Sequence, residues 1–383
     1  MSGATSDLLD RARRAAQQAA LHAADVDHHA RFPAESLDAL RRERLLGVHV
    51  SVPLGGEGAS LKDLSAICGV LAQSCATTGM IYAMHQIQVG CMVRHAHTPA
   101  FDAYLTELVE RQRLIASATS EAGIGGDTRR SGCAVEVDGA RFRLEKNASV
   151  ISYGAQTDDI LVTARRHPEA VPSDQVLALV KDADVKLEAT GGWDTLGMRG
   201  TCSLGFKLRA EAPRDQILPE PFADISAQTM VPYSHILWAS VWLGIATDAV
   251  RRARMTVRNE ARKKPGTIPP SASRLAELTL QLHLMRAALR DGIEEYERRM
   301  DDPDALASLS FAVRMNNLKL AASEAVVAIT SRALLIAGIA GYRNDSELSL
   351  GRHLRDAHSA SIMISNDRLY ATNATLLLAV RED

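Results

Sequence analysis

The spacing of apolar residues changes twice along the chain, and this limits the folds that the chain can adopt. Residues 1–115 carry apolar residues at helical spacing, residues 116–222 show the alternation of short strands, and residues 223–383 return to long helical patterns. Helices, then strands, then helices is an unusual order for one chain, and no internal repeat is visible. The sequence predicts an α+β protein with three domains at these boundaries.

The first zone contains recognisable helix signals. In "FPAESLDALRRERLLG", Pro33 stands at a helix start and Gly47 follows as a stop. The Ala-rich stretch at 61–96 predicts a longer helix that is broken around residues 77–79. This zone is therefore expected to be a helical domain.

The middle zone has strand periodicity. "CAVEVDGARFRLE" alternates on both sides of Asp138–Gly139, which indicates a β-hairpin. "DDILVTARR" and "QVLALVKD" are two further short strands. Several short strands at this spacing are typical of a small barrel or sandwich.

The last zone predicts a helical bundle. The helix that contains "SHILWASVWLGIATDAV" has one apolar stripe, formed by Leu237, Val241, Ile245 and Ala249. Two more long helices are expected at 272–300 and 310–338, separated by prolines, which is the pattern of an antiparallel bundle. Residues 352–370 read as one further amphipathic helix.

Composition narrows the possible partners and compartment. A net charge of −2 gives no reason to expect nucleic acid or an anionic membrane as a partner. The five cysteines lack metal-ligand spacing and a CxxC pair, and no signal peptide is visible, so we expect a cytoplasmic protein with no metal site. No apolar run approaches the roughly 20 residues that span a bilayer.

Five short motifs carry the functional signal. The first is a Gly-rich turn, which allows backbone N–H groups to approach a polar ligand. It is not a Rossmann fingerprint, because it lacks GxGxxG between a strand and a helix. In order along the chain the motifs are "SEAGIGGD" (120–127), "ISYG" (151–154), "GMRGT" (197–201), "GIAGY" (338–342) and "RDA" (355–357).

In order and spacing these motifs resemble those of the acyl-CoA dehydrogenase superfamily. The resemblance implies an N-terminal helical domain, a middle β-barrel and a C-terminal four-helix bundle, assembled as a homotetramer or homodimer. It also implies FAD between barrel and bundle, with Ser120 hydrogen-bonded to the flavin ring and Ser152 near flavin N5. A hydroxyl group there can donate to oxidised flavin or accept from the N5–H of reduced flavin.

The remaining cofactor contacts implied by the resemblance are backbone and cationic groups. Gly125, Gly338 and Gly341 match glycines of the family motifs, and Arg262 matches an arginine that reaches the FAD of a neighbouring subunit. The Phe and the paired glutamines that usually follow this arginine are absent. Val150 stands where the family has a Trp that covers the flavin, which leaves a more open flavin edge.

The chain lacks the carboxylate that the family uses as its catalytic base. A dehydrogenase of this family removes a proton beside the thioester carbonyl while the flavin accepts hydride, so a base must face the substrate. Ile364 stands at one of the two family positions for this Glu, and Ser234 or the neighbouring His235 stands at the other.

Three side chains are candidates for the missing role. His358, two residues after Asp356, and His85, in a largely apolar stretch, offer imidazoles with an ordinary pKa near 6.5. Glu121 is a carboxylate that the family uses structurally. A branch of the same fold, the flavin-dependent monooxygenases, lacks the Glu and lets reduced flavin react with O2. His85, Ser152 and His358 resemble the set of that branch.

Three hypotheses follow from the sequence. The first is an oxidoreductase that uses O2 and acts on a CoA thioester or a small aromatic substrate. The second is an acyl-CoA dehydrogenase with an unusual base, which passes electrons to an electron-transfer flavoprotein. The third is a catalytically silent paralogue, either FAD-binding or purely structural. The lost Glu favours the first.

Overall fold

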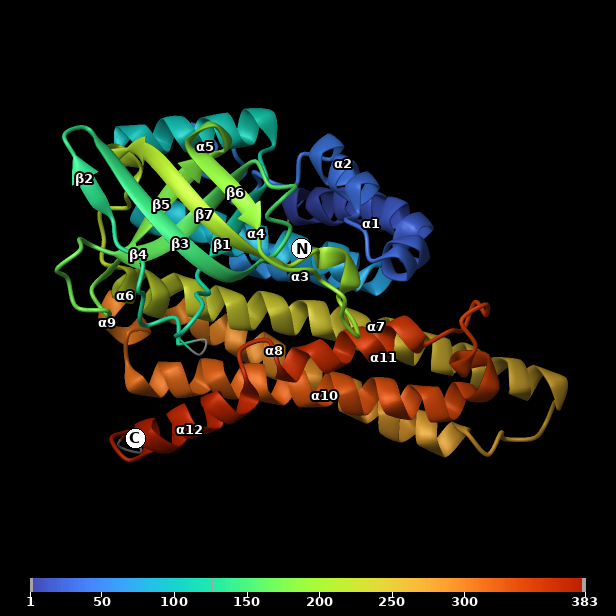
Figure 1. The fold of residues 1–383 in the computed structure, drawn as a ribbon. Helices are drawn as coiled ribbons and strands as arrows, with labels where there is room; N and C mark the ends of the chain where they lie inside the picture. Colours follow the sequence, from blue (N-terminus) through green and yellow to red (C-terminus); the bar gives the residue numbers. More distant parts are fainter. Residues whose placement is uncertain (1–2, 125–126, 381–383) are drawn as a thin grey trace.

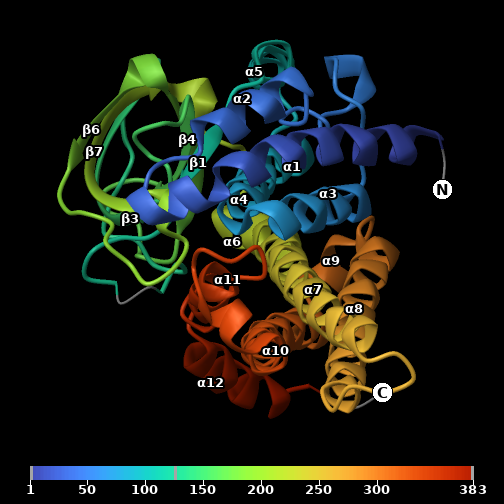
Figure 2. The same cartoon turned by 90° about the vertical axis from the view of Figure 1, so that its right-hand side faces the viewer.

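The computed structural model describes residues 3–124 and 127–380. The N-terminal helices lie beside the strands, and both pack above the long C-terminal helices (Figure 1). Figure 2 looks along these long helices and shows the strands and the N-terminal helices on one side of them. The predicted order of helices, strands and helices is confirmed.

Five helices form the N-terminal part. They are α1 (Gly3–His29), α2 (Ala34–Arg42), α3 (Leu61–Ser74), α4 (Ala76–His95) and α5 (Pro99–Arg111). Ser60 and Asp63 form a capping box at the start of α3. The predicted break lies slightly earlier than expected, because Cys75 has an extended backbone between α3 and α4.

The strands form two sheets, with orders β1-β4-β5 and β2-β3-β7-β6. Their bounds are β1 (Ile115–Ala118), β2 (Glu136–Asp138), β3 (Arg141–Ile151), β4 (Asp159–Arg165), β5 (Gln175–Lys181), β6 (Val185–Ala189) and β7 (Leu204–Pro213). The predicted hairpin is the β2–β3 pair. β4 and β5 are buried along most of their length, whereas most of β3 alternates between buried and exposed residues because one of its faces meets solvent.

The C-terminal part is a bundle of long helices. Its helices are α6 (Phe222–Ile225), α7 (Val231–Lys263), α8 (Ala272–Arg299), α9 (Pro303–Leu306), α10 (Leu309–Tyr342), α11 (Gly351–His358) and α12 (Asn366–Leu377). A π-helical turn at Ser226–Met230 joins α6 to α7. The four predicted stripe residues of α7 are all buried, as expected for a helix at the centre of the bundle.

α10 is the longest helix that the structure describes and has a kink near its end. Gly338 has φ 60° and ψ −142°, a conformation that a side chain would strain. Among the described residues α10 is the one helix that is long and apolar enough to cross a membrane by length and composition, although Arg332 interrupts its apolar run. It packs against α7, α8, α11 and α12, as a core helix does.

The expectation of a single helix at 352–370 is wrong. α11 ends at His358, a 3-10 turn covers Ser359–Ser361, and α12 begins only at Asn366. Ile364 has φ 51°, a left-handed conformation that is rare for a β-branched residue. The helical pattern continues across this break in sequence, so the break is visible only in three dimensions.

Candidate active site

A row of hydroxyl groups lies where the end of β3 meets the start of β7. Ser152 Oγ lies 2.8 Å from Ser203 Oγ, which lies 2.9 Å from Thr201 Oγ1. Thr201 donates its only hydroxyl hydrogen to the Met198 carbonyl, so Ser203 must donate to Thr201 and Ser152 to Ser203. Ser152 Oγ is therefore left with free acceptor lone pairs, and the residue is half-buried.

The backbone around Ser152 is held by two local features. The β3–β7 register shifts between Ala148 and Ile151, which is a bulge of the kind that re-aims side chains near active sites. Tyr153 has φ 46°, and its N–H donates to the Thr201 carbonyl at 2.7 Å. Together these features fix the direction of the hydroxyl row.

His85 supports this region from the α4 side. Its Nε2 lies 2.9 Å from the Leu46 carbonyl, and its Nδ1 accepts from the Ile115 N–H at 3.1 Å. The Ile115 carbonyl in turn accepts from the Tyr153 hydroxyl at 3.0 Å. Burial lowers the pKa of His85 to about 4, so the ring is neutral with the proton on Nε2. Both nitrogens are occupied by backbone partners, and one of these partners, Ile115, links His85 to Tyr153, the neighbour of Ser152.

Ser120 is tied to the end of β3. Its hydroxyl donates to the Val150 carbonyl at 2.8 Å and accepts from the Val150 N–H at 3.2 Å. The Val150 side chain remains 40 % exposed. Ser120 is thus held beside Val150, the residue that stands where the resemblance places the Trp that covers the flavin.

The Glu121 carboxylate is bonded to backbone and side-chain groups of its own chain. Its carboxylate accepts from the backbone N–H groups of Gly132 and Cys133, both at 3.0 Å, and from Lys146 at 3.2 Å. Lys146 is fully buried, and burial lowers its pKa although Glu121 opposes this shift. All the described partners of Glu121 are groups of the sheet region, so it is a poor candidate for a base.

The "GMRGT" motif is a docking loop that brings the sheets, α1, α4 and α11 together. A Cβ atom on Gly197 would lie 2.2 Å from the Arg355 carbonyl oxygen, and one on Gly200 would lie 2.4 Å from Val26 Cγ1. Between them the Met198 N–H donates to Asp356 Oδ1 at 2.6 Å. Burial raises the pKa of Asp356 to about 6. The motif glycines are therefore explained by close packing.

His358 ends α11, and Ile364 lies within the break that precedes α12. His358 is exposed at the last position of α11, two residues after Asp356. The Ile364 carbonyl accepts from Lys319 Nζ at 2.6 Å, and Asn366 Oδ1 accepts from the same ammonium at 2.6 Å. The position of the family carboxylate is thus occupied by an apolar residue whose backbone is bonded to a buried cation.

Sequence reasoning overlooked Lys319, although it named the nearby His235. Burial lowers the pKa of Lys319 to about 8, and its ammonium lies 5.8 Å from the centre of the Trp242 ring. His235 is buried nearby, and neither ring nitrogen has a hydrogen-bond partner among the described residues. Burial lowers the pKa of His235 to about 3, and the charge of Lys319 adds to this effect. The sequence did contain a signal for this buried cation, because Lys319 interrupts the apolar helical pattern of residues 310–338.

The other predicted cofactor residues lie apart from Ser152. Arg262 is exposed in the last turn of α7, and the helix runs away from the sheets toward this end (Figure 1). Gly338 and Gly341 lie near the end of α10; a Cβ on Gly341 would lie 2.6 Å from Ala337 Cβ. Gly125 lies outside the described residues. Within the described chain, Arg262, Gly338 and Gly341 do not form one site with Ser152.

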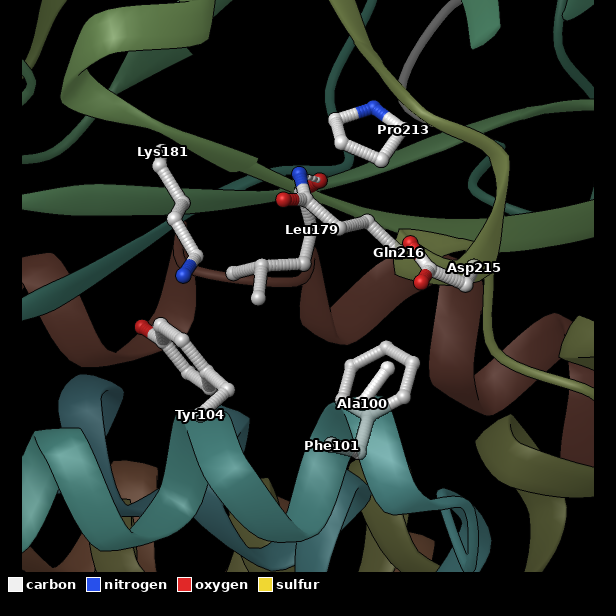
Figure 3. A pocket seen from close by; sticks show the side chains of 8 residues that line it. All are labelled: Ala100, Phe101, Tyr104, Leu179, Lys181, Pro213, Asp215 and Gln216. Carbon is white, nitrogen blue, oxygen red and sulfur yellow. Dashed lines mark hydrogen bonds between the residues drawn. The ribbon is translucent and has the colours of Figure 1, made fainter. Parts of the chain in front are cut away.

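The pocket shown in Figure 3 lies between α5 and β5 and has a volume of about 240 Å³. Tyr104 donates to Asp159 at 2.7 Å, and Lys181 pairs with Glu107 at 3.3 Å. None of the predicted site residues lines it. Among the described residues no group of three or more His, Cys, Asp or Glu could hold a metal ion.

Comparison with known protein families identifies both helical parts of the chain. Residues 4–112 match the family model "Acyl-CoA dehydrogenase, N-terminal domain", and residues 226–364 match "Acyl-CoA dehydrogenase, C-terminal domain". Together these matches cover well over half of the chain.

Three characterised relatives illustrate the range of the family. The amino sugar nitrososynthase DnmZ of Streptomyces peucetius is 25 % identical over 93 % of this chain and 88 % of its own length. A dibenzothiophene monooxygenase of Mycolicibacterium goodii is 26 % identical over 80 % of this chain and 78 % of its own length. The mitochondrial short-chain specific acyl-CoA dehydrogenase of Bos taurus is 27 % identical over 89 % of this chain and 81 % of its own length.

A solved structure shows the same fold. FMN-bound TdsC of Paenibacillus sp. A11-2 superposes with a TM-score of 0.85 and covers 98 % of both chains. Its sequence identity of 20 % extends the likeness to the fold alone.

Proposed function

Because the chain belongs to the acyl-CoA dehydrogenase family of flavin-dependent oxidoreductases, we propose that its reduced flavin reacts with O2 in the oxidation of a small substrate. The observation that carries the proposal is the replacement of the base. At the α11–α12 break the chain presents Ile364 and the cation of Lys319, and on α7 it presents Ser234 and a neutral His235. None of these groups is a carboxylate that could take the substrate α-proton.

The row of hydroxyl groups at Ser152, Ser203 and Thr201 also supports a reaction of reduced flavin with O2. A bound flavin supplies hydride acceptance when oxidised and electrons for O2 when reduced. Ser152 has already donated its hydrogen to Ser203, so its oxygen is arranged to accept from an N–H group. Reduced flavin carries such a group at N5. The arrangement therefore favours the state that reacts with O2.

The described residues fit a flavin. Val150 is exposed where the family has a covering Trp, Ser120 is bonded to the Val150 backbone, and Ser152 supplies a free oxygen. We propose FAD as the cofactor, with Gly125, Gly338, Gly341 and Arg262 among its contacts. FMN is the alternative, favoured by the missing Phe and glutamines after Arg262 and by the FMN in TdsC.

We assign Ser152 and His358 to the reacting groups and His85 to positioning. Ser152 is connected to α11 through Ser203, Thr201, Met198 and Asp356. His358 ends the same helix, and its exposed imidazole is accessible to a bound ligand. His85, which we expected to react, acts instead through Ile115 and Tyr153.

The substrate class remains a CoA thioester or a small aromatic molecule. The monooxygenase relative acts on dibenzothiophene, which favours the aromatic class. The second candidate function is α,β-dehydrogenation of an acyl-CoA with an electron-transfer flavoprotein as acceptor. The 27 % identity to a short-chain acyl-CoA dehydrogenase favours it.

We further propose that the protein works as a homotetramer or homodimer in the cytoplasm. An apolar groove of about 480 Å³ runs between α8 and α10 and is lined by Leu284, Ala288 and Ile329, among others. Leu280 and Leu335 are also exposed on these helices. A second copy on this face would bury these side chains, and Arg262 at the bundle end could then reach a partner's flavin.

Reconstitution tests the proposal. The purified chain is loaded with FAD or FMN, reduced chemically without O2, and mixed with O2 in the presence of indole, dibenzothiophene or short acyl-CoA. We expect O2 consumption coupled to an oxygenated product with one substrate class, and loss of coupling in Ser152→Ala and His358→Ala. Failure to bind either flavin would favour the silent paralogue.

A further inference from the structure

A polar cavity of about 800 Å³ lies where the end of α1, the loop before Arg199 and the start of α11 meet. None of the residues assigned above to the flavin lines it. Arg199, Arg352 and Arg355 all face it, together with His28, His29 and His353. Asp25 and Asp27 also line it, but Asp25 is paired with Arg31 and His29. The cationic and imidazole groups that remain are suited to an anionic ligand.

Two of the three guanidinium groups are neutralised within the chain. Arg355 forms an ion pair with Asp27, and Arg199 lies 3.4 Å from the exposed Asp194. Arg352 differs, because its one described hydrogen bond is to the Ser74 carbonyl, at 3.1 Å. Its charge acts on Asp356 only at longer range. Arg352 therefore retains hydrogen-bond donors and an unpaired charge for a ligand.

The cavity lining also contains two unused acceptors. His353 is 6 % exposed, and its Nε2 lies 2.8 Å from Asp248 Oδ2. Although burial opposes it, hydrogen bonds from His353 and Arg252 hold the pKa of Asp248 well below its ordinary value. Burial lowers the pKa of His353 although Asp248 opposes this shift. In a neutral ring whose Nε2 donates to Asp248, Nδ1 is left as an acceptor.

Neither acceptor has a partner. His353 Nδ1 and Asp27 Oδ1 are both buried atoms with no hydrogen-bond partner among the described residues. Buried acceptors without partners cost stability and normally bond to water or to a ligand. An anion alone would satisfy Arg352 but not these two atoms, which require O–H or N–H donors.

We propose that this cavity binds a hydroxyl-bearing phosphate ester, such as the ribose phosphate part of a nucleotide. Arg352 holds the phosphate group, and Asp27 Oδ1 and His353 Nδ1 accept hydrogen bonds from the sugar hydroxyls. The site is independent of the oxygen chemistry proposed above, since it shares no assigned residue with it. Its volume accommodates a nucleotide-sized ligand.

Calorimetric titration of the full chain tests this assignment with three probes: ribose 5-phosphate, inorganic phosphate and ribose. We expect ribose 5-phosphate to bind tighter than phosphate and phosphate tighter than ribose. Arg352→Met should weaken ribose 5-phosphate binding at least tenfold, because a charge-assisted contact is lost. Arg352→Lys should keep part of the affinity. Arg13→Met removes the same charge from a surface pair with Asp10 and should change nothing.

Three outcomes would overturn the proposal. They are no binding of ribose 5-phosphate to the wild-type chain, equal affinity in Arg352→Met, and equal losses in Arg352→Met and Arg13→Met. The 31P signal of ribose 5-phosphate with the wild-type chain checks binding without any variant. Displacement of the probe by saturating FAD or FMN would assign the cavity to the flavin and would also refute an independent site.

Discussion

Substitution of Gly197 by Ala tests whether the "GMRGT" loop is the joint between the sheets and α11. The added Cβ would lie 2.2 Å from the Arg355 carbonyl oxygen and 2.7 Å from the Asp356 backbone nitrogen. These are backbone atoms of a helix, which cannot rotate away as a flexible side chain could. Either the loop or α11 must therefore shift, and the hydrogen bond from Met198 to Asp356 stretches with it.

The structure sets the expected magnitude. Overpacking at a tight contact costs about 1–3 kcal/mol, and loss of a hydrogen bond to a charged group costs about 1.5–3 kcal/mol. The two losses overlap, because one movement causes both. We expect Gly197→Ala to lower the free energy of unfolding by about 2–5 kcal/mol.

Gly192 is the matched control. It lies in the same loop, and nothing lies within 4 Å of a Cβ built on it. Urea unfolding followed by circular dichroism and by Trp193 fluorescence compares the two variants with the wild type. Gly192→Ala should stay within about 1 kcal/mol of the wild type. Equal midpoints for both variants would show that the loop does not press on α11.

Three further predictions concern buried groups and the bundle face. The pKa of Asp356 is raised from 3.8 to about 6 in the folded chain, so between these values the folded state binds more protons than the unfolded state. The free energy of unfolding should therefore fall as the pH rises from 4 to 6, by up to about 3 kcal/mol. Asp356→Asn should remove this decrease. His85→Leu should destabilise by about 2–4 kcal/mol, because the Leu46 carbonyl and the Ile115 N–H lose their bonds to the ring. Thermal melts measure this loss. Leu284→Glu, at a position 62 % exposed in one chain, should leave the monomer fold unchanged and reduce the molecular mass measured by light scattering.

The fold could be predicted because the spacing of apolar residues indicates where helices and strands form. The four stripe residues of α7 are buried as their spacing of four residues requires. The β2–β3 hairpin follows from Asp138–Gly139. The break at residues 359–365 could not be predicted in this way. It depends on Lys319, whose ammonium bonds the Ile364 carbonyl from another helix.

The site was harder to predict because motif glycines and histidines have several uses. Gly197 and Gly200 resembled functional glycines, but the structure explains them by the packing of α11 and α1. His85 resembled a reactive group, but both its nitrogens bond to backbone atoms of other segments. The orientation of the Ser152 hydroxyl depends on a row of residues that only the fold brings together.

Anaerobic titration of the flavin-loaded chain with short-chain acyl-CoA tests the central claim most directly. The absorbance of oxidised flavin reports whether the thioester delivers electrons without O2. Because no described carboxylate takes the place of the family base, we predict that the flavin absorbance does not change. Bleaching of the flavin by butyryl-CoA would show that the chain is a dehydrogenase and would contradict the proposed reaction with O2.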